Sequence, residues 1–355
     1  MPDRRWGISL PLDGMPLHQQ AALLREAEDL GYTDAWTAEV DGVDAFSPLA
    51  VAALSTRHMR LGTAIVNVYT RGPATIAMSA AGMAEIAPGR FCLGLGSGSK
   101  PIVETWNGGR FDRPLQRVRD VAGIVRRALS GERVVTETPS LAVGGFRLSR
   151  PVQGEVPIFI AALRQNMLRL AGEIGDGVIL NWLSPEDVAT CLAEVRAGMR
   201  RAGRDPATAP FEVGARLFVW LTDDRAAADQ LARRSIAGYL TVPTYRAFHD
   251  WLGRQEALAP MQEAWSAGDR KRATEVIPPR LVDDLLIIGT PEQCRERVLQ
   301  YMDAGITVPF LQLHFPHQLA GAGPGQNPAR PPAELNAWAM RALAPGPRHT
   351  GVGPR

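Results

Sequence analysis

The chain has 355 residues, 45% of them hydrophobic and 21% charged, so it can bury a substantial core and is not expected to be disordered. Its 39 basic and 37 acidic residues leave a net charge of +2, which excludes the strong field that would attract a nucleic acid or a membrane surface. The apolar runs are too short to span a bilayer, so neither a nucleic acid nor a membrane is an expected partner.

The cysteines and the first residues indicate a cytoplasmic protein. Cys92, Cys191 and Cys294 lie far apart without CxxC spacing, which predicts reduced thiols and no disulfide framework or zinc site. A signal peptide is not supported, because Pro11 and Asp13 interrupt the apolar stretch near the start. The expected location is therefore the cytoplasm.

Strands and helices are predicted to alternate over the first 130 residues. The pattern predicts buried strands at 6–10, 34–38, 60–66 and 91–96, and helices at 17–30, 48–55, 73–86 and 114–129. The residues at 131–156 contain glycine, proline and short apolar runs, which indicate an extended excursion or a hairpin.

The alternation resumes after this excursion. Strands are predicted at 157–161, 177–180, 211–221 and 307–313, with helices at 167–174, 185–201 and 291–304. Thr290 is expected to cap the last of these helices. The segment 224–284 is mostly helical and too long for a single crossover, so it is expected to cover one end of the sheet.

Eight strand–helix units predict an α/β fold, a TIM (β/α)8 barrel with insertions, in a single domain over residues 1–319. A tail rich in glycine and proline follows over 320–355, with a helix predicted at 334–343. An open doubly wound sheet is disfavoured, because its glycine fingerprint would follow the first strand. Here Gly94, Gly96 and Gly98 follow the fourth, and Ser99 replaces the last glycine of GxGxxG.

In a TIM barrel the active site lies at the C-terminal ends of the strands. The candidates at these ends are Asp13, Glu39, Asn67, Ser97, Gly98, Ser99, Arg164 and Trp182. No metal-ligand set stands out, and His314 and His317 are interpreted as ordinary polar residues. Glu39 and Asp13 could serve as a carboxylate pair, but no GxSxG elbow is present. Small, apolar strand exits favour a bound organic cofactor.

Four sequence blocks resemble one known family, the luciferase-like monooxygenase superfamily, and within it the reductases and dehydrogenases that use the deazaflavin coenzyme F420. These blocks are Gly-Arg-Phe-Cys-Leu-Gly-Leu-Gly-Ser-Gly at 89–98, Arg-Pro-Leu at 113–115, Ile-Ala-Ala-Leu at 160–163 with Asp-Gly at 176–177, and Gly-Thr-Pro-Glu at 289–292. The four occur in the family's order and cover nearly the whole chain.

The resemblance implies a barrel that holds the deazaflavin ring near its centre. A non-proline cis peptide at Ala64–Ile65 would support the ring from behind, and Asn67 would make a polar contact to it. The other residues that the family places at the cofactor are Ser97, Gly98 and Ser99, and, near the phosphodiester, Ala162, Leu163 and Arg164. Glu39 matches an acidic residue after the second strand. Trp182, at a strand exit, is a further candidate cofactor contact.

Two departures from the family limit what the resemblance implies. Sugar-phosphate dehydrogenases of this type have a catalytic histidine directly after the acid, where this chain has Val40, so oxidation of a sugar alcohol is disfavoured. Many relatives have Gly-Pro where this chain has Arg164-Gln165. The arginine could pair with a phosphate or narrow the site, and this leaves F420 and FMN both open as cofactors.

Each of these residues could also have a purely structural role. The glycines could serve only close packing, Glu39 could be a loop acid, and Asp13 and Asn67 could form turns. The predicted function is an F420-dependent oxidoreductase that transfers hydride to a small substrate with an electrophilic C=C, C=N or C=O group, with Glu39 or Asp13 as catalytic residues. The alternatives are an FMN-dependent monooxygenase and a non-catalytic binding protein. A homodimer is expected by resemblance.

Overall fold

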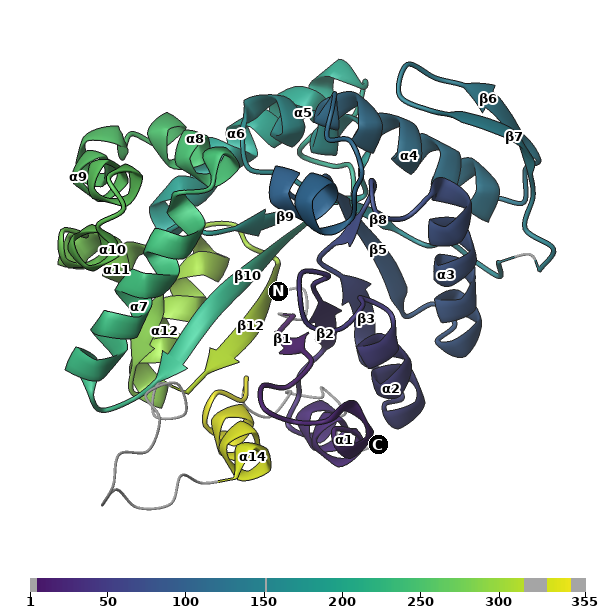
Figure 1. Ribbon diagram of the computed structural model, residues 1–355. Helices are drawn as coiled ribbons and strands as arrows, with labels where there is room; N and C mark the ends of the chain where they lie inside the picture. Colours follow the sequence, from purple (N-terminus) through teal and green to yellow (C-terminus); the bar gives the residue numbers. More distant parts are fainter. Residues whose placement is uncertain (1–4, 151, 316–330, 346–355) are drawn as a thin grey trace.

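The computed structural model describes residues 5–150, 152–315 and 331–345, and its centre is a closed barrel of eight parallel strands (Figure 1). The barrel strands are β1 Gly7–Leu10, β2 Asp34–Thr37, β3 Arg60–Thr63, β5 Phe91–Gly96, β8 Ile158–Ala161, β9 Gly177–Asn181, β10 Glu212–Leu221 and β12 Val308–His314. They pair in the order β12-β1-β2-β3-β5-β8-β9, and β10 closes the ring by pairing with both β9 and β12. The predicted fold is therefore confirmed.

Two short strands extend this sheet. β4, Val66–Asn67, continues the third barrel strand after a bulge and pairs with β5. β11, Ile287–Gly289, pairs with the end of β10 and was not predicted. The strand predicted at 60–66 is thus two strands separated by Ala64 and Ile65.

Helices surround the barrel on the outside (Figure 1). They are α1 Ala21–Asp29, α2 Ser47–Ser55, α3 Pro73–Ile86, α4 Pro114–Leu129, α5 Gln165–Ile174, α6 Pro185–Arg201, α12 Pro291–Asp303 and α14 Pro332–Ala342. A 3-10 turn at Leu17–Gln19 precedes α1. Proline occupies the first turn of α4, α6 and α12, where no N–H partner is needed. Thr290 caps α12 through a capping box, as expected.

The lower half of the barrel interior is filled with aromatic side chains. Trp36 stacks on Phe310 with ring centroids 5.2 Å apart and meets the edge of Phe159 at 5.5 Å. Below them Arg60 binds Asp34 at 2.7 Å and Glu212 at 2.6 Å. A Cβ at Gly94 would lie 1.9 Å from the Thr63 carbonyl oxygen, so that glycine serves packing between strands.

Two insertions leave the barrel. The first is an antiparallel hairpin of β6 Val134–Glu137 and β7 Ala142–Phe146, inside the predicted excursion. The second contains α7 Arg225–Leu240, α8 Pro243–Trp251, α9 Gln255–Ser266, α10 Arg270–Glu275 and α11 Pro279–Leu285. These helices have an apolar cluster of their own, which includes Trp182 and Phe218 from the barrel.

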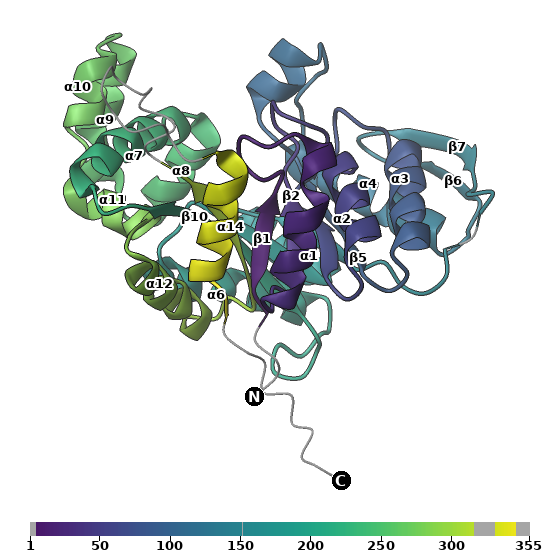
Figure 2. The same cartoon turned by 90° about the horizontal axis from the view of Figure 1, so that it is seen from below.

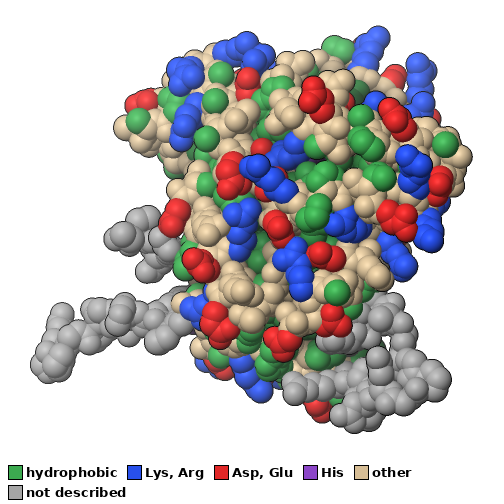
Figure 3. Space-filling view, turned by 90° about the vertical axis from the view of Figure 1, so that its left-hand side faces the viewer, with side chains coloured by type: hydrophobic (Ala, Val, Ile, Leu, Met, Phe, Trp, Pro, Cys, Tyr) green, Lys and Arg blue, Asp and Glu red, His purple; other side chains and the backbone are tan. Residues whose placement is uncertain are grey.

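The surface charge, the thiols and the helices of the described residues agree with the composition. Basic and acidic side chains are interspersed over the face seen in Figure 3. Cys92, Cys191 and Cys294 are buried and free, and burial raises the pKa of the Cys92 thiol to about 12. Of the helices in the described ranges, none combines the length and the apolar character needed to cross a bilayer. His317 and residues 320–330 and 346–355 of the predicted tail lie outside the described residues.

Candidate active site at the barrel mouth

The floor of the mouth is the bulge between β3 and β4. The Ala64–Ile65 peptide bond is cis, as the resemblance implied, and both side chains are half-buried. A Cβ at Gly96 would lie 2.9 Å from Ile65 Cγ1 and 3.2 Å from Ala161 Cβ. Glycine at 96 therefore lets the bulge lie flat against β5 and β8, which leaves a small-residue surface at the strand ends.

The exit of β5 brings Asn67 and Gly98 together. Asn67 is 2% exposed, and its Oδ1 accepts a hydrogen bond from the Tyr69 amide at 2.8 Å. Gly98 has φ +62°, and a Cβ there would lie 2.2 Å from Asn67 Nδ2. Asn67 thus forms a turn and also lies beside Gly98, a predicted cofactor contact. Only glycine fits at position 98, because a larger residue would collide with the Asn67 amide.

Ser97 and Ser99 are half-buried beside Gly98, and an unpredicted element follows them. Pro101–Trp106 forms a π-helix, a rare form that is frequent at functional sites. In Figure 2 this element and the helices α7 to α10 project on the same side of the barrel. The mouth therefore has raised walls on two sides.

Glu39, at the exit of β2, is held by Arg71. Nη2 and Nε of Arg71 donate to Glu39 Oε1 at 2.7 and 3.0 Å, and Arg71 lies over the Phe46 ring at 5.2 Å. The hydrogen bond from Arg71 to Glu39 is the main cause that raises the pKa of Arg71. The carboxylate therefore ties the β2 exit to the segment before α3.

Asp13 lies in a different environment from Glu39. It is exposed at the exit of β1, and its carbonyl oxygen accepts a hydrogen bond from Asn336 of α14 at 3.0 Å. The structure does not join these two acids into a carboxylate pair.

The exit of β8 presents three predicted residues with different exposure. Ala162 is buried and its N–H donates to the Ile179 carbonyl at 3.1 Å, Leu163 is half-buried, and Arg164 is exposed at the start of α5. The Arg164 side chain has no hydrogen bond or ion pair to any described residue. An exposed cation at a helix N-terminus is suited to a phosphate.

Trp182 lies under the helical insertion. It is 1% exposed and packs against Phe218 and Tyr239, each with ring centroids 4.6 Å away. This position anchors α7 to the ends of β9 and β10. These ring contacts support a packing role for Trp182. Its contact with a cofactor stays a prediction.

The polar side chains at the ends of β9 and β12, Asn181 and His314, were expected at the mouth without an assigned role, and Arg216 on β10 was not predicted. Asn181 Nδ2 lies 3.4 Å from the Tyr245 hydroxyl of α8, and Arg216 lies over the Phe218 ring at 5.0 Å. His314 is close to the same ring, and burial lowers the pKa of its imidazole to about 4, so it is neutral at pH 7. A signal was available, because Arg216 is the one charged residue within 213–221.

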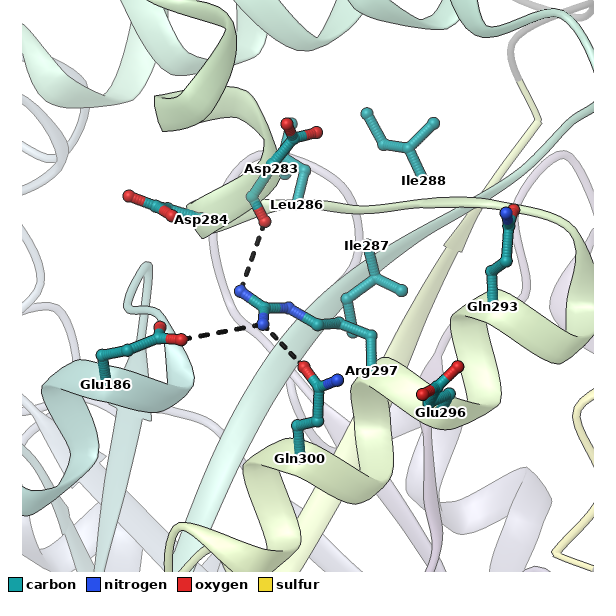
Figure 4. A pocket seen from close by; sticks show the side chains of 10 residues that line it. All are labelled: Glu186, Asp283, Asp284, Leu286, Ile287, Ile288, Gln293, Glu296, Arg297 and Gln300. Atoms are coloured by element: carbon teal, nitrogen blue, oxygen red, sulfur yellow. Dashed lines mark hydrogen bonds and ion pairs between the residues drawn. The ribbon is translucent and has the colours of Figure 1, made fainter.

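A separate cavity of about 430 Å³ lies where α6, α11, β11 and α12 meet (Figure 4). Its lining is charged, with Glu186, Asp283 and Asp284 around Arg297. Arg297 Nη1 donates to Gln300 Oε1 at 2.7 Å. None of the predicted site residues lines this cavity. Within the described residues, no three His, Cys, Asp or Glu side chains are grouped to hold a metal ion.

The comparisons with known proteins agree on one family. The sequence matches the family described as luciferase-like monooxygenase over residues 5–308. Rv3520c of Mycobacterium tuberculosis, whose name is that of a coenzyme F420-dependent oxidoreductase, is 30% identical over 322 residues, 85% of this chain and 91% of that protein. The 5,10-methylenetetrahydromethanopterin reductase of Archaeoglobus fulgidus is 30% identical over 315 residues, 85% of this chain and 91% of that protein.

Among solved structures, the fold is similar to that of the coenzyme F420-dependent tetrahydromethanopterin reductase from Methanopyrus kandleri. The TM-score is 0.75 with 23% identity, over 96% of this chain and 97% of that chain. At this identity the likeness supports the barrel fold alone.

Proposed function

We propose that this chain, which belongs to the luciferase-like monooxygenase family, is an oxidoreductase that uses coenzyme F420. The reaction would be hydride transfer between the deazaflavin and a small organic substrate with an electrophilic C=C, C=N or C=O group. The observation that carries the proposal is the cradle formed by the cis bulge and the exit of β5, where glycine lets the main chain lie against Ile65 at position 96 and against Asn67 at position 98. The name of the Mycobacterium tuberculosis relative supports the same cofactor.

The residues around this cradle fit a planar ring with a phosphodiester. Ala64 and Ile65 would lie behind the ring, with Asn67 and the 97–99 segment at its edge. Ala162, Leu163 and Arg164 would hold the phosphodiester, since an exposed guanidinium at a helix start binds phosphate well. The bound group supplies the hydride, and the protein supplies orientation and a dry site.

The two predicted catalytic acids would act differently. Glu39 is engaged by Arg71, so it would position the loop that flanks the cis bond. Asp13 is exposed and acts electrostatically on His314, whose pKa it raises against the larger effect of burial. Asp13 is therefore the better placed of the two to orient the substrate or to relay a proton.

The insertion 224–284 would cover the mouth and select the substrate. Two contacts support this role: Tyr239 of α7 packs on Trp182, and Tyr245 of α8 lies 3.4 Å from Asn181. Side chains from these helices would exclude water from the ring, which strengthens electrostatic contacts at the site.

A homodimer is the proposed assembly. The outer faces of α2 and α3 carry Leu54, Met78 and Ile86, which are 81%, 52% and 42% exposed. Large apolar side chains that face water on adjacent helices are typical of a contact surface. A second copy of the chain is the occupant that the resemblance implies.

The cofactor proposal is tested by thermal unfolding of the purified protein with F420, with FMN and without ligand. A ligand at 100 times its dissociation constant should stabilise the fold by about 2.7 kcal/mol. We expect protection by F420, followed by oxidation of reduced F420 when activated alkenes or imines are added. Protection by FMN alone would favour the monooxygenase, and protection by neither would favour a non-catalytic binding protein.

A further inference from the structure

Most of the predicted cofactor residues lie on one arc of the barrel, and several polar residues that they leave unused lie on the other. Apart from Trp182, which follows β9, the cofactor set follows β3, β5 and β8, which are neighbours in the strand order. Asn181, Arg216, Gln312 and His314 lie on β9, β10 and β12, which are neighbours on the other side. A molecule that meets the ring from across the mouth would therefore contact this second arc.

Arg216 points into the barrel. A Cβ at Gly214 would lie 3.5 Å from Phe310 Cε1 and 3.7 Å from Ile179 Cγ1, both in the interior cluster, and side chains two residues apart on a strand share a face. Arg216 pairs in register with Asn181 on β9 and with Phe310 on β12. Its guanidinium therefore lies one layer above the aromatic plug, at the level of the mouth.

The Arg216 guanidinium has no acceptor among the described residues. It lies over the Phe218 ring, 5.0 Å from the ring centroid. In the same barrel interior, Arg60 at the closed end meets two carboxylates, Asp34 and Glu212, at 2.7 and 2.6 Å. A half-buried guanidinium carries five donors that burial makes costly to leave unpaired, so an acceptor from a bound molecule is expected.

The groups around Arg216 favour an anion as that acceptor. Tyr245 and Asn181 offer a hydroxyl and an amide, 3.4 Å apart, and Arg216 acts electrostatically on Tyr245 and on His314. No ion pair joins Arg216 to Asp13 or to another carboxylate of the described residues. The planar guanidinium matches a carboxylate or a phosphate in bidentate geometry.

We propose that Arg216, with Tyr245 and Asn181, binds a carboxylate or phosphate group of the substrate and so selects small anionic substrates. That the bound anion is part of a substrate rests on the proposed function, whereas anion binding at Arg216 does not. The phosphodiester of the cofactor is the other source of such an anion, and Arg164 on the opposite arc is its proposed partner. Variants of the two arginines can therefore be compared, one for the binding of a small anion and the other for the binding of the cofactor.

The test titrates sodium phosphate and sodium succinate into the protein at constant ionic strength and follows tryptophan fluorescence. Trp220 packs near His314 on this arc, with ring centroids 5.6 Å apart, and serves as a reporter. We expect saturable quenching in the wild type, a loss of about tenfold or more in anion affinity for Arg216→Gln, and a smaller loss for Arg216→Lys. Arg164→Gln should leave the succinate affinity reported by this quenching unchanged, since Arg164 lies on the opposite arc, and should weaken F420 binding.

Several results would overturn the assignment. One is the absence of a saturable response in the wild type, and another is an anion affinity in Arg216→Gln equal to that of the wild type. A loss of F420 affinity in Arg216→Gln would also overturn it, because Arg216 would then bind the anion of the cofactor. If F420 fails to bind the wild type while phosphate binds through Arg216, the proposed function fails and the anion site stands. If Arg216→Gln does not fold by circular dichroism, Tyr245→Phe replaces it and should weaken anion binding several-fold, and wild-type affinity would then refute the proposal.

Discussion

Replacing Gly98 by alanine should weaken cofactor binding much more than the same change at a remote glycine. The alanine would keep φ near +62°, which costs an L-residue about 1–2 kcal/mol. Its Cβ would lie 2.2 Å from Asn67 Nδ2, well inside contact distance, so the buried Asn67 amide must move. Moving it disturbs the 2.8 Å bond to the Tyr69 amide, a further cost of about 1 kcal/mol. We expect a total loss of stability of about 2–3 kcal/mol.

Gly203→Ala is the matched control. Gly203 has φ +71° with no atom within 4 Å of an added Cβ, and it follows α6 at the other end of the barrel. It should lose only the backbone cost of about 1–2 kcal/mol and keep wild-type cofactor affinity. Urea unfolding gives both stabilities, and F420 fluorescence titration gives both affinities. An affinity in Gly98→Ala within about twofold of Gly203→Ala would refute the cradle, since the expected loss is about tenfold.

Three further predictions concern stability and assembly. Burial lowers the pKa of His249 to about 3, whereas the unfolded chain protonates near 6.5, so stability should fall as pH drops through that window. Between about pH 7 and 5 this loss is about 2 kcal/mol, and urea unfolding of His249→Leu should lack it, whereas an unchanged slope contradicts the assignment. Met78→Glu should convert a dimer into monomers by analytical ultracentrifugation, and an unchanged mass would exclude α3 from the interface. Gly94→Ala should yield little folded protein by circular dichroism, because its Cβ meets the Thr63 carbonyl at 1.9 Å, and a wild-type melting curve would contradict this packing.

The barrel was predictable from local patterns. Strands buried on both faces read as short apolar runs, and the helices at 114–129 and 185–201 were predicted to the residue because proline marks their first turns. The cis bond at Ala64–Ile65 was predictable only through the resemblance to a family.

The roles of single residues depended on contacts that the sequence does not display. Gly94 reads as part of a cofactor loop, but its neighbour across the sheet is a backbone oxygen of Thr63. Glu39 reads as a free catalytic acid, but Arg71, 32 positions away, holds it. Arg216 was overlooked because one charge in an apolar strand has no periodic signal until the facing strands are known. The roles of these three residues thus depend on contacts with residues far away in the sequence.

The most direct test of the central proposal is a fluorescence titration of oxidised F420 with the purified wild-type protein, repeated with excess FMN. The account predicts saturation at one F420 per chain, little displacement by FMN, and weaker binding in Gly98→Ala and Arg164→Gln. A titration that never saturates, or one in which both variants bind as the wild type does, would contradict a deazaflavin site at the barrel mouth.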